Sequence, residues 1–203
     1  DVIRVEPGTY NEQVTVDKAN VLLYSSDRSA TTITDRVVVS ADGATLCGFT
    51  VSPSDASSTA GEDEAIRVSP SPDDVTIVNN IVEDFRRAPG SSGFFGTDGI
   101  NVFGGQAGSP SDTINDVTVR DNTIRNVYNS VSGGSTGVSI QGNVDGATVK
   151  DNIIEEIGVN PSGTPVNSYA FGVVIRGTDN HSVDPKNINV VDNDVSSVLA
   201  SDS

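Results

Sequence analysis

The stretch Val117-Thr-Val-Arg-Asp-Asn-Thr-Ile124 decides the fold, because its pattern recurs along the chain. In each copy an alternating apolar strand runs into Asp-Asn or Asn-Asn, and a second alternating strand follows. The other copies are Val75-Thr-Ile-Val-Asn-Asn-Ile-Val82, Ala147-Thr-Val-Lys-Asp-Asn-Ile-Ile154, Ile188-Asn-Val-Val-Asp-Asn-Asp-Val195 and a degenerate Ala44-Thr-Leu-Cys-Gly-Phe-Thr-Val51. Unequal intervals between the copies predict a solenoid whose turns carry loops of different length.

A second, shorter element precedes the full copies. It reads Ala65-Ile-Arg-Val68, Gly99-Ile-Asn-Val102, Gly137-Val-Ser-Ile140 and Gly172-Val-Val-Ile175. Each unit therefore holds three short strands, and no helical periodicity of comparable length competes. We expect an all-β coil of parallel strands, each paired with its equivalents about 4.8 Å away in the neighbouring turns. Apolar columns are expected to face inward at Ile66, Val68, Ile100, Val102, Val138, Ile140, Val173 and Ile175.

The predicted coil has about six turns with three strands per turn, and residues 1–203 form one domain. The competing architecture is an antiparallel sandwich. The aligned asparagines count against a sandwich, because that fold gives no reason for the same bend in every repeat. We interpret the chain as a fragment or mature segment of a longer chain.

The composition is strongly acidic, with 28 Asp and Glu against 12 Lys and Arg and a formal net charge of −16. Such a chain repels nucleic acid and anionic membrane surfaces. An acid excess without long acidic runs is typical of proteins from salt-loving organisms, and a generic acidic secreted protein is the alternative. The single Cys47 excludes an internal disulfide and is expected to be a small core residue. No apolar run is long enough to span a membrane.

The repeated bends resemble the asparagine ladder of the right-handed parallel β-helix superfamily, the pectate-lyase-like fold. The opening Ile3-Arg-Val-Glu-Pro-Gly-Thr-Tyr-Asn-Glu-Gln-Val14 is similar to the first coil of pectin esterases and of NosD-type repeat proteins. The resemblance covers nearly the whole chain and implies a single-stranded right-handed parallel β-helix. It leaves the activity open, because this fold carries lyases, hydrolases, esterases, epimerases, phage tailspikes and non-enzymatic surface proteins.

The family's catalytic signatures are absent. The chain has no Trp, no Asp pair followed by Gly-X-His-Gly, and Asp184-Pro185 continues as Lys-Asn instead of His-Glu. The single histidine, His181, is expected in an exposed loop, with acid–base work beside Asp179 as the alternative. The sequence does not decide whether the protein is an enzyme and favours a non-catalytic role. Any catalysis would resemble that of polysaccharide lyases, hydrolases or epimerases, with Glu64, Arg67 and Asp98 as the candidate catalytic residues.

Two columns are expected at the repeated bend. The first is a structural ladder, in which side-chain amides bond to their equivalents in neighbouring turns: Asn80, Asn122, Asn152 and Asn193. The second is a column of carboxylates at Asp121, Asp151 and Asp192. Oxygen-rich columns of this kind are candidates for Ca²⁺. The alternative is a solvated acidic edge whose repulsion is relieved by neighbouring basic residues.

The outward face of the short repeated element is the candidate binding surface. Long glycine-containing loops lead into it at residues 84–98, 127–136 and 158–171, and such loops on a rigid scaffold often carry function. Aromatic rings stack on sugars, and Arg and amide side chains bond to hydroxyls and carboxylates. The candidate binding residues are Arg67, Phe95, Asn101, Gln141, Tyr169 and Arg176. The alternative is that the loops only cover the side of the coil.

Two hypotheses of function follow. The first is a secreted or cell-surface domain that interacts with a polysaccharide on this face, by binding and possible modification. The second is a non-catalytic structural or adhesive module of an envelope, stalk or fibre that assembles through stacked turns. The expected partners are polysaccharide or cell-envelope components, or further copies of the chain.

Overall fold

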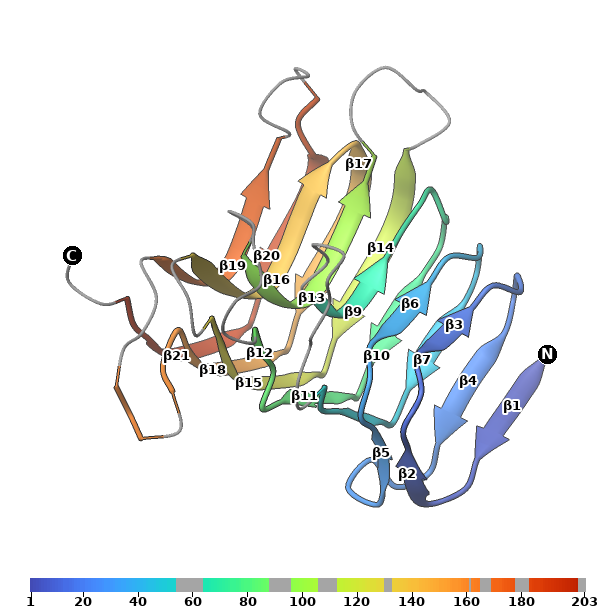
Figure 1. The fold of residues 1–203 in the computed structure, drawn as a ribbon. Coiled ribbons are helices and arrows are strands. Elements are labelled where there is room, and N and C mark those ends of the chain that lie inside the picture. The colour runs from blue at the N-terminus through green and yellow to red at the C-terminus, as the bar shows by residue number, and fades with distance from the viewer. Residues whose placement is uncertain are drawn as a thin grey trace.

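The computed structural model describes residues 1–53, 64–87, 96–105, 113–129, 133–160, 162–164, 169–177 and 183–200. Within these ranges the regular structure consists of short β-strands arranged in three sheets, which the chain visits in turn as it winds along one axis (Figure 1). This recurrence of the three sheets confirms the all-β coil that the repeats predict.

Sheet A contains the strands that precede the repeated bend. They are β1 (Val2–Val5), β4 (Leu22–Ser25), β7 (Thr45–Cys47), β10 (Thr76–Val78), β14 (Ile114–Arg120), β17 (Val144–Lys150) and β20 (Lys186–Val191). Sheet B contains the strands that follow it. They are β2 (Gly8–Tyr10), β5 (Thr31–Ile33), β8 (Thr50–Val51), β11 (Ile81–Glu83), β15 (Thr123–Asn129), β18 (Ile153–Ile157) and β21 (Asp194–Val198).

Sheet C contains the short repeated element. Its strands are β3 (Val14–Val16), β6 (Val37–Val39), β9 (Glu64–Val68), β13 (Thr97–Gly104), β16 (Gly134–Gly142) and β19 (Tyr169–Arg176). A further strand, β12 (Arg86–Arg87), pairs with β15 outside the main order of sheet B.

Strand pairing in all three sheets is parallel, and each strand pairs with its counterpart one turn away. Thr76 of β10 pairs with Thr45 of β7 on one side and with Thr118 of β14 on the other. Sheets A and B each run through seven turns and sheet C through six. The chain is therefore a parallel β-helix with three strands per turn and six to seven turns. An antiparallel sandwich is excluded, because its neighbouring strands would run in opposite directions.

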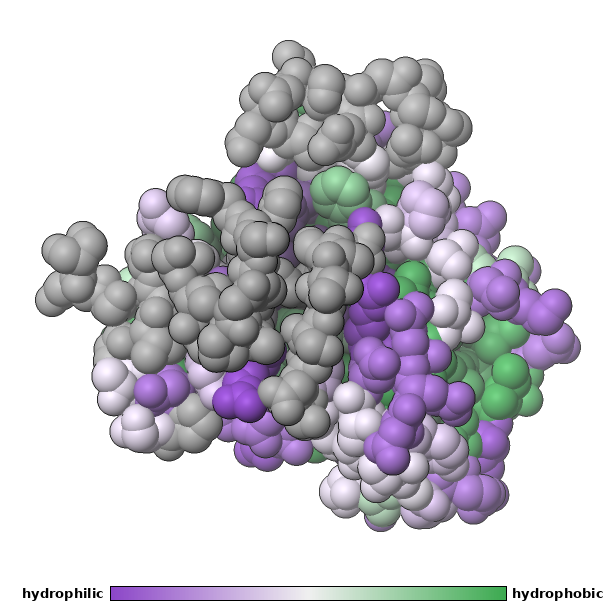
Figure 2. All heavy atoms as spheres, in the orientation of Figure 1, coloured by the Kyte–Doolittle hydropathy of each residue, from purple (hydrophilic) through white to green (hydrophobic). Residues whose placement is uncertain are grey.

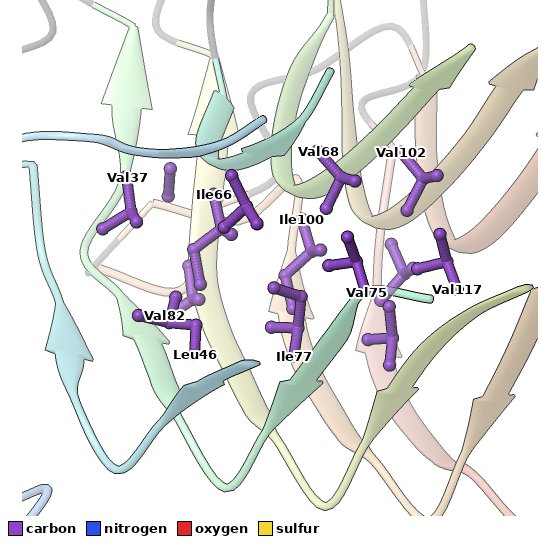
Figure 3. Packing of buried hydrophobic residues seen from close by; sticks show 14 of the residues in the cluster. Val37, Leu46, Ile66, Val68, Val75, Ile77, Val82, Ile100, Val102 and Val117 are labelled. Carbon is purple, nitrogen blue, oxygen red and sulfur yellow. The ribbon is translucent and has the colours of Figure 1, made fainter. Parts of the chain in front are cut away.

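The core lies inside the coil, where apolar side chains from the three sheets meet (Figure 3). The predicted columns of sheet C are fully buried from β9 to β16, including Ile66, Ile100 and Ile140. Ile175 is the exception, since it is 46% exposed. It belongs to β19, the last strand in the order of sheet C, so no further strand of that sheet packs over it. Ile175 pairs in register with the buried Ile140, so it continues the predicted column but is left uncovered at this end.

Asparagine side chains stack at the bend between sheets A and B. The backbone N and Nδ2 of Asn80 donate to Asn122 Oδ1 at 3.0 and 3.2 Å. Asn122 donates in the same way to Asn152 Oδ1, at 3.0 Å for both atoms. Asn152 donates to Asn193 Oδ1 at 3.1 and 2.9 Å. In the degenerate copy, Phe49 N donates to Asn80 Oδ1 at 3.0 Å, so the backbone joins the ladder without a side chain.

The residue before each ladder asparagine has a left-handed backbone conformation. The φ angles are 56° for Asn79, 57° for Asp121, 54° for Asp151 and 54° for Asp192, and Gly48 takes this position in the degenerate copy at 80°. Gly, Asn and Asp tolerate positive φ better than other residues. Backbone geometry therefore accounts for the Asp-Asn and Asn-Asn dipeptides without any ligand.

Glycines at the start of the sheet C strands allow sheets B and C to approach closely. A Cβ atom on Gly99 would lie 2.7 Å from Ile124 Cγ2, and one on Gly137 would lie 2.5 Å from Ile154 Cγ2. Real Cβ atoms do not approach so closely, so these positions exclude any larger residue. The glycines thus fix how tightly one face of the coil packs on the next.

The described surface is mainly hydrophilic, and apolar residues gather at the end of the coil that carries the N-terminus (Figure 2). Val2 and Ile3 are exposed at that end. Cys47 is only partly buried, in contrast to the predicted core position, because alternation along β7 turns Leu46 inward and Cys47 outward. The described ranges contain no helix that is long and apolar enough to cross a membrane, which agrees with the absence of such a run in the sequence.

Candidate polysaccharide-binding face

The outer face of sheet C carries an irregularity that brings extra polar residues to the surface of the coil. In β9, Ala65 and Ile66 are both fully buried, so the neighbours Glu64 and Arg67 share the outer face although they are three residues apart. The same happens in β13, where the pairing with β16 passes over Gly99. This departure from strict alternation recurs in register in neighbouring strands, so neither strand of a pair carries an extra residue. Because of it, Asp98 lies on the outer face and not inside the coil.

Parallel register then aligns these residues across the turns. Asp98 pairs with Glu64 on one side and with Thr136 on the other. Asn101 pairs with Arg67 on one side and with Ser139 on the other. Two adjacent polar columns result, and the neighbours within each column are one strand spacing apart, about 4.8 Å.

Side-chain hydrogen bonds and one ion pair join five of the predicted site residues into one group, which we call the polar cluster: Glu64, Arg67, Asp98, Asn101 and Gln141. Asn101 Nδ2 donates to Glu64 Oε1 at 3.0 Å. Gln141 Nε2 lies 3.2 Å from Asp98 Oδ2 and 3.5 Å from Asn101 Oδ1, and both oxygens accept from it. Arg67 Nη1 lies 3.8 Å from Glu64 Oε1. The structure therefore brings together residues that come from three successive turns.

The polar cluster is more buried than an open outward face would be. Asp98 is 5% exposed, Asn101 is 4% exposed and Gln141 is 7% exposed. Burial of polar groups is tolerated when they are hydrogen-bonded, and Asp98, Asn101 and Gln141 each take part in such a bond. A low-dielectric setting also strengthens each of these bonds relative to water. The cluster is thus a preorganised network and not a set of independent surface side chains.

Residues that sequence reasoning did not select also belong to this site. Arg67 Cζ lies 5.4 Å from the centroid of the Phe103 ring, within the range of a cation–π contact. Ser139 Oγ accepts from Gln141 Nε2 at 2.6 Å. Phe103 and Ser139 are single outward positions in alternating strands, and only the register shows that they touch the cluster. The sequence could have pointed to them because they occupy the same positions of the repeated element as the predicted binding residues.

Exposure rises at β19, the next strand of sheet C. Tyr169 is 59% exposed and Phe171 is 44% exposed, and Phe171 pairs with Thr136 of the first polar column. Arg176 is also exposed and pairs with Gln141. Two aromatic rings and a guanidinium group thus stand beside the buried cluster on the same sheet. Of the other predicted residues, Phe95, Asp179 and His181 lie outside the described residues.

The Asp column at the repeated bend lies far from this face in the architecture, between sheets A and B. Asp121 and Asp151 are exposed, and each forms an ion pair with the residue before it, Arg120 or Lys150. In the part of the chain that the structure describes, no group of three or more His, Cys, Asp or Glu side chains is arranged to hold a metal ion. Calcium binding by Asp121, Asp151 and Asp192 therefore stays a prediction, and no such group among the described residues supports it.

Comparisons of the chain with family models, curated proteins and solved structures found no match. The parallel β-helix therefore stands on the sheet register, while membership of the pectate-lyase-like superfamily stays a prediction.

The chemistry that the face offers follows from its side chains. Exposed aromatic rings present flat apolar surfaces, on which the C–H face of a sugar ring packs. Carboxylates and hydroxyls accept hydrogen bonds from sugar hydroxyls. Glu64 and Asp98 are in-register neighbours on adjacent strands. Catalysis by these two residues with Arg67 stays a prediction.

Proposed function

We propose that the protein is a secreted or cell-surface β-helix domain that binds a polysaccharide along the outer face of sheet C. The observation that carries the proposal is the buried, internally bonded polar cluster beside the exposed Tyr169 and Phe171. A sheet that only covered a core would have no need of linked polar side chains on its outer face, because satisfied buried networks are costly to assemble. A rigid, preorganised polar face next to aromatic rings suits a repetitive, hydroxyl-rich ligand.

The geometry of the coil supports an extended ligand. Equivalent positions recur about every 4.8 Å along the axis, so a polymer running across the strands meets one residue of each column in every turn. In the proposed complex, the sugar rings pack on Tyr169 and Phe171 and their hydroxyls reach the rim of the cluster. An extracellular or cell-surface location is part of the proposal, and the acidic composition is its support.

A glycan array followed by calorimetry with the strongest ligand tests this proposal. Replacement Tyr169→Ala removes an exposed ring, and we expect it to weaken binding at least tenfold without changing the melting temperature. The matched control is Ile153→Ala, which truncates an apolar side chain that is 46% exposed on sheet B. The proposal fails if no polysaccharide binds, or if both variants weaken binding equally.

A second candidate function is a structural module of an envelope, stalk or fibre that assembles through stacked turns. One observation favours it: Ile175, Val190 and Val195 of the turn β19–β21 are 41–46% exposed. Apolar side chains at the end of a solenoid are stabilised when another layer covers them. Sedimentation velocity distinguishes this function, since it predicts assemblies that grow with protein concentration. A single monomeric species over a hundredfold range of concentration would contradict it.

A further inference from the structure

We propose that the polar cluster selects uncharged polysaccharides and rejects polymers of uronic acids. This inference rests on the proposed function and adds the chemical class of the ligand. It follows from which hydrogen-bond donors of the cluster are already in use and from the charge that the cluster carries.

The amide and guanidinium donors point at the cluster's own carboxylates. Asn101 Nδ2 donates to Glu64 Oε1 at 3.0 Å, and Arg67 Nη1 lies 3.8 Å from the same oxygen. Gln141 Nε2 donates to Asp98 Oδ2 at 3.2 Å and to Ser139 Oγ at 2.6 Å. A ligand therefore meets a group in which the side-chain amides of Asn101 and Gln141 already donate to carboxyl oxygens of the cluster.

This inventory discriminates between two kinds of sugar. An ionised uronate carboxylate only accepts hydrogen bonds. It therefore needs N–H donors, and those of this cluster are already bonded to other side chains within it. A neutral sugar hydroxyl both donates and accepts, and it therefore adapts to a surface rich in oxygen acceptors. Binding of a uronate would require Asn101 or Gln141 to release its carboxylate partner, which would leave a buried charge poorly paired.

Charge acts in the same direction. Glu64 and Asp98 place two carboxyl groups beside the single guanidinium group of Arg67, and the whole chain has a formal net charge of −16. Repulsion between like charges is strong where burial keeps out water and salt. Arg176 is the exposed cation beside the cluster, and its attraction for a uronate is weakened by solvent and salt.

The test compares matched oligosaccharides of equal length by calorimetry at one ionic strength. The neutral set contains fragments of glucan, xylan and mannan, and the acidic set contains fragments of polygalacturonate and alginate. We expect at least one neutral ligand to bind at least tenfold more tightly than every acidic ligand. Acidic ligands binding as tightly as neutral ones would overturn the inference while leaving the proposed function intact. Binding by neither set would overturn the proposed function itself.

A charge-neutral variant locates the selectivity. Asp98→Asn replaces a buried carboxyl group with a neutral amide, and we expect it to reduce the preference for neutral over acidic ligands by at least fivefold. The matched control is Asp74→Asn, the same chemical change at an exposed left-handed position outside sheet C, which leaves the preference unchanged. An unchanged preference in folded Asp98→Asn would overturn the role of the cluster.

The wild-type protein provides a second measurement that does not depend on a variant. Added NaCl screens the long-range repulsion from the chain's net charge of −16, so the affinity for acidic ligands is expected to rise severalfold between low and high salt. Affinity for neutral ligands is expected to stay within twofold over the same range. Acidic ligands whose binding weakens with salt would show attraction in place of repulsion, and the inference would then be wrong.

Discussion

Replacement of a central ladder residue, Asn122→Ala, is expected to destabilise the coil severely. Its side chain takes part in four hydrogen bonds. Oδ1 accepts from Asn80 N at 3.0 Å and from Asn80 Nδ2 at 3.2 Å. Nδ2 donates to Ile77 O at 2.9 Å and to Asn152 Oδ1 at 3.0 Å. Asn122 is 1% exposed, so water does not replace the lost partners.

The expected loss in the free energy of unfolding depends on which polar groups lose their hydrogen bond to the Asn122 side chain. Asn80 Nδ2 keeps its bond to Leu46 O, and Asn152 Oδ1 keeps its bond from Asn122 N. Asn80 N and Ile77 O each lose a bond in a buried setting. At about 1–3 kcal/mol for each such group, the expected loss in the free energy of unfolding is about 4 kcal/mol.

The same substitution at the last rung of the ladder is the internal control. Asn193 accepts from Asn152 N and Nδ2 and donates to Val149 O, so it makes equivalent bonds. Its partial exposure lets water satisfy the groups that Asn193→Ala leaves behind, and we expect a loss of about 1 kcal/mol. Urea titration monitored by circular dichroism at constant salt measures both variants. Equal losses, or a loss below about 1 kcal/mol for Asn122→Ala, would refute the reasoning from burial.

Three further predictions concern the backbone, the packing and the thiol. Asp121→Ala is expected to cost about 1–2 kcal/mol because φ is 57°, and Asp121→Gly less than Asp121→Ala; equal melting temperatures would contradict this. Gly137→Ala places Cβ 2.5 Å from Ile154 Cγ2 and 2.7 Å from Gly172 O. Thermal melting should therefore show a loss of more than about 2 kcal/mol in the free energy of unfolding. An unchanged stability would mean that sheets B and C separate easily. Burial raises the pKa of the Cys47 thiol, and the charge of Arg120 opposes this rise. Less thiolate is therefore present at pH 8, and alkylation of Cys47 should be slower than that of free cysteine. An equal rate of alkylation would contradict this prediction.

Much of the fold was available from the sequence because its signals are local and repeated. The residue before each ladder asparagine is Asn or Asp, and Gly48 takes this position in the degenerate copy. Each of these residue types tolerates the left-handed φ that the bend requires. The apolar alternation predicted the inward columns of sheet C correctly for every turn that has a neighbour on both sides. It did not predict the exposure of Ile175, because burial there depends on a neighbouring strand, which no local pattern records.

The candidate site was predicted as a set of outward residues but not as a network. Strict alternation from Asn101 would turn Asp98 inward, and only the irregularity at Gly99 returns it to the outer face. The burial of Asp98 and Gln141 was also not predictable, since alternation distinguishes the inner face from the outer face and not open from covered positions.

The sequence by itself determined the repeat, the parallel coil and the asparagine ladder, because each depends on residue types at a fixed place in every turn. Only the tertiary structure decided which outward residues touch one another. Glu64, Asp98 and Gln141 are separated by loops of unequal length, and their contacts depend on the strand register between turns. Hydrogen bonds of the main chain set that register across the whole sheet, so the polar cluster is a property of the stacked coil and not of any single repeat.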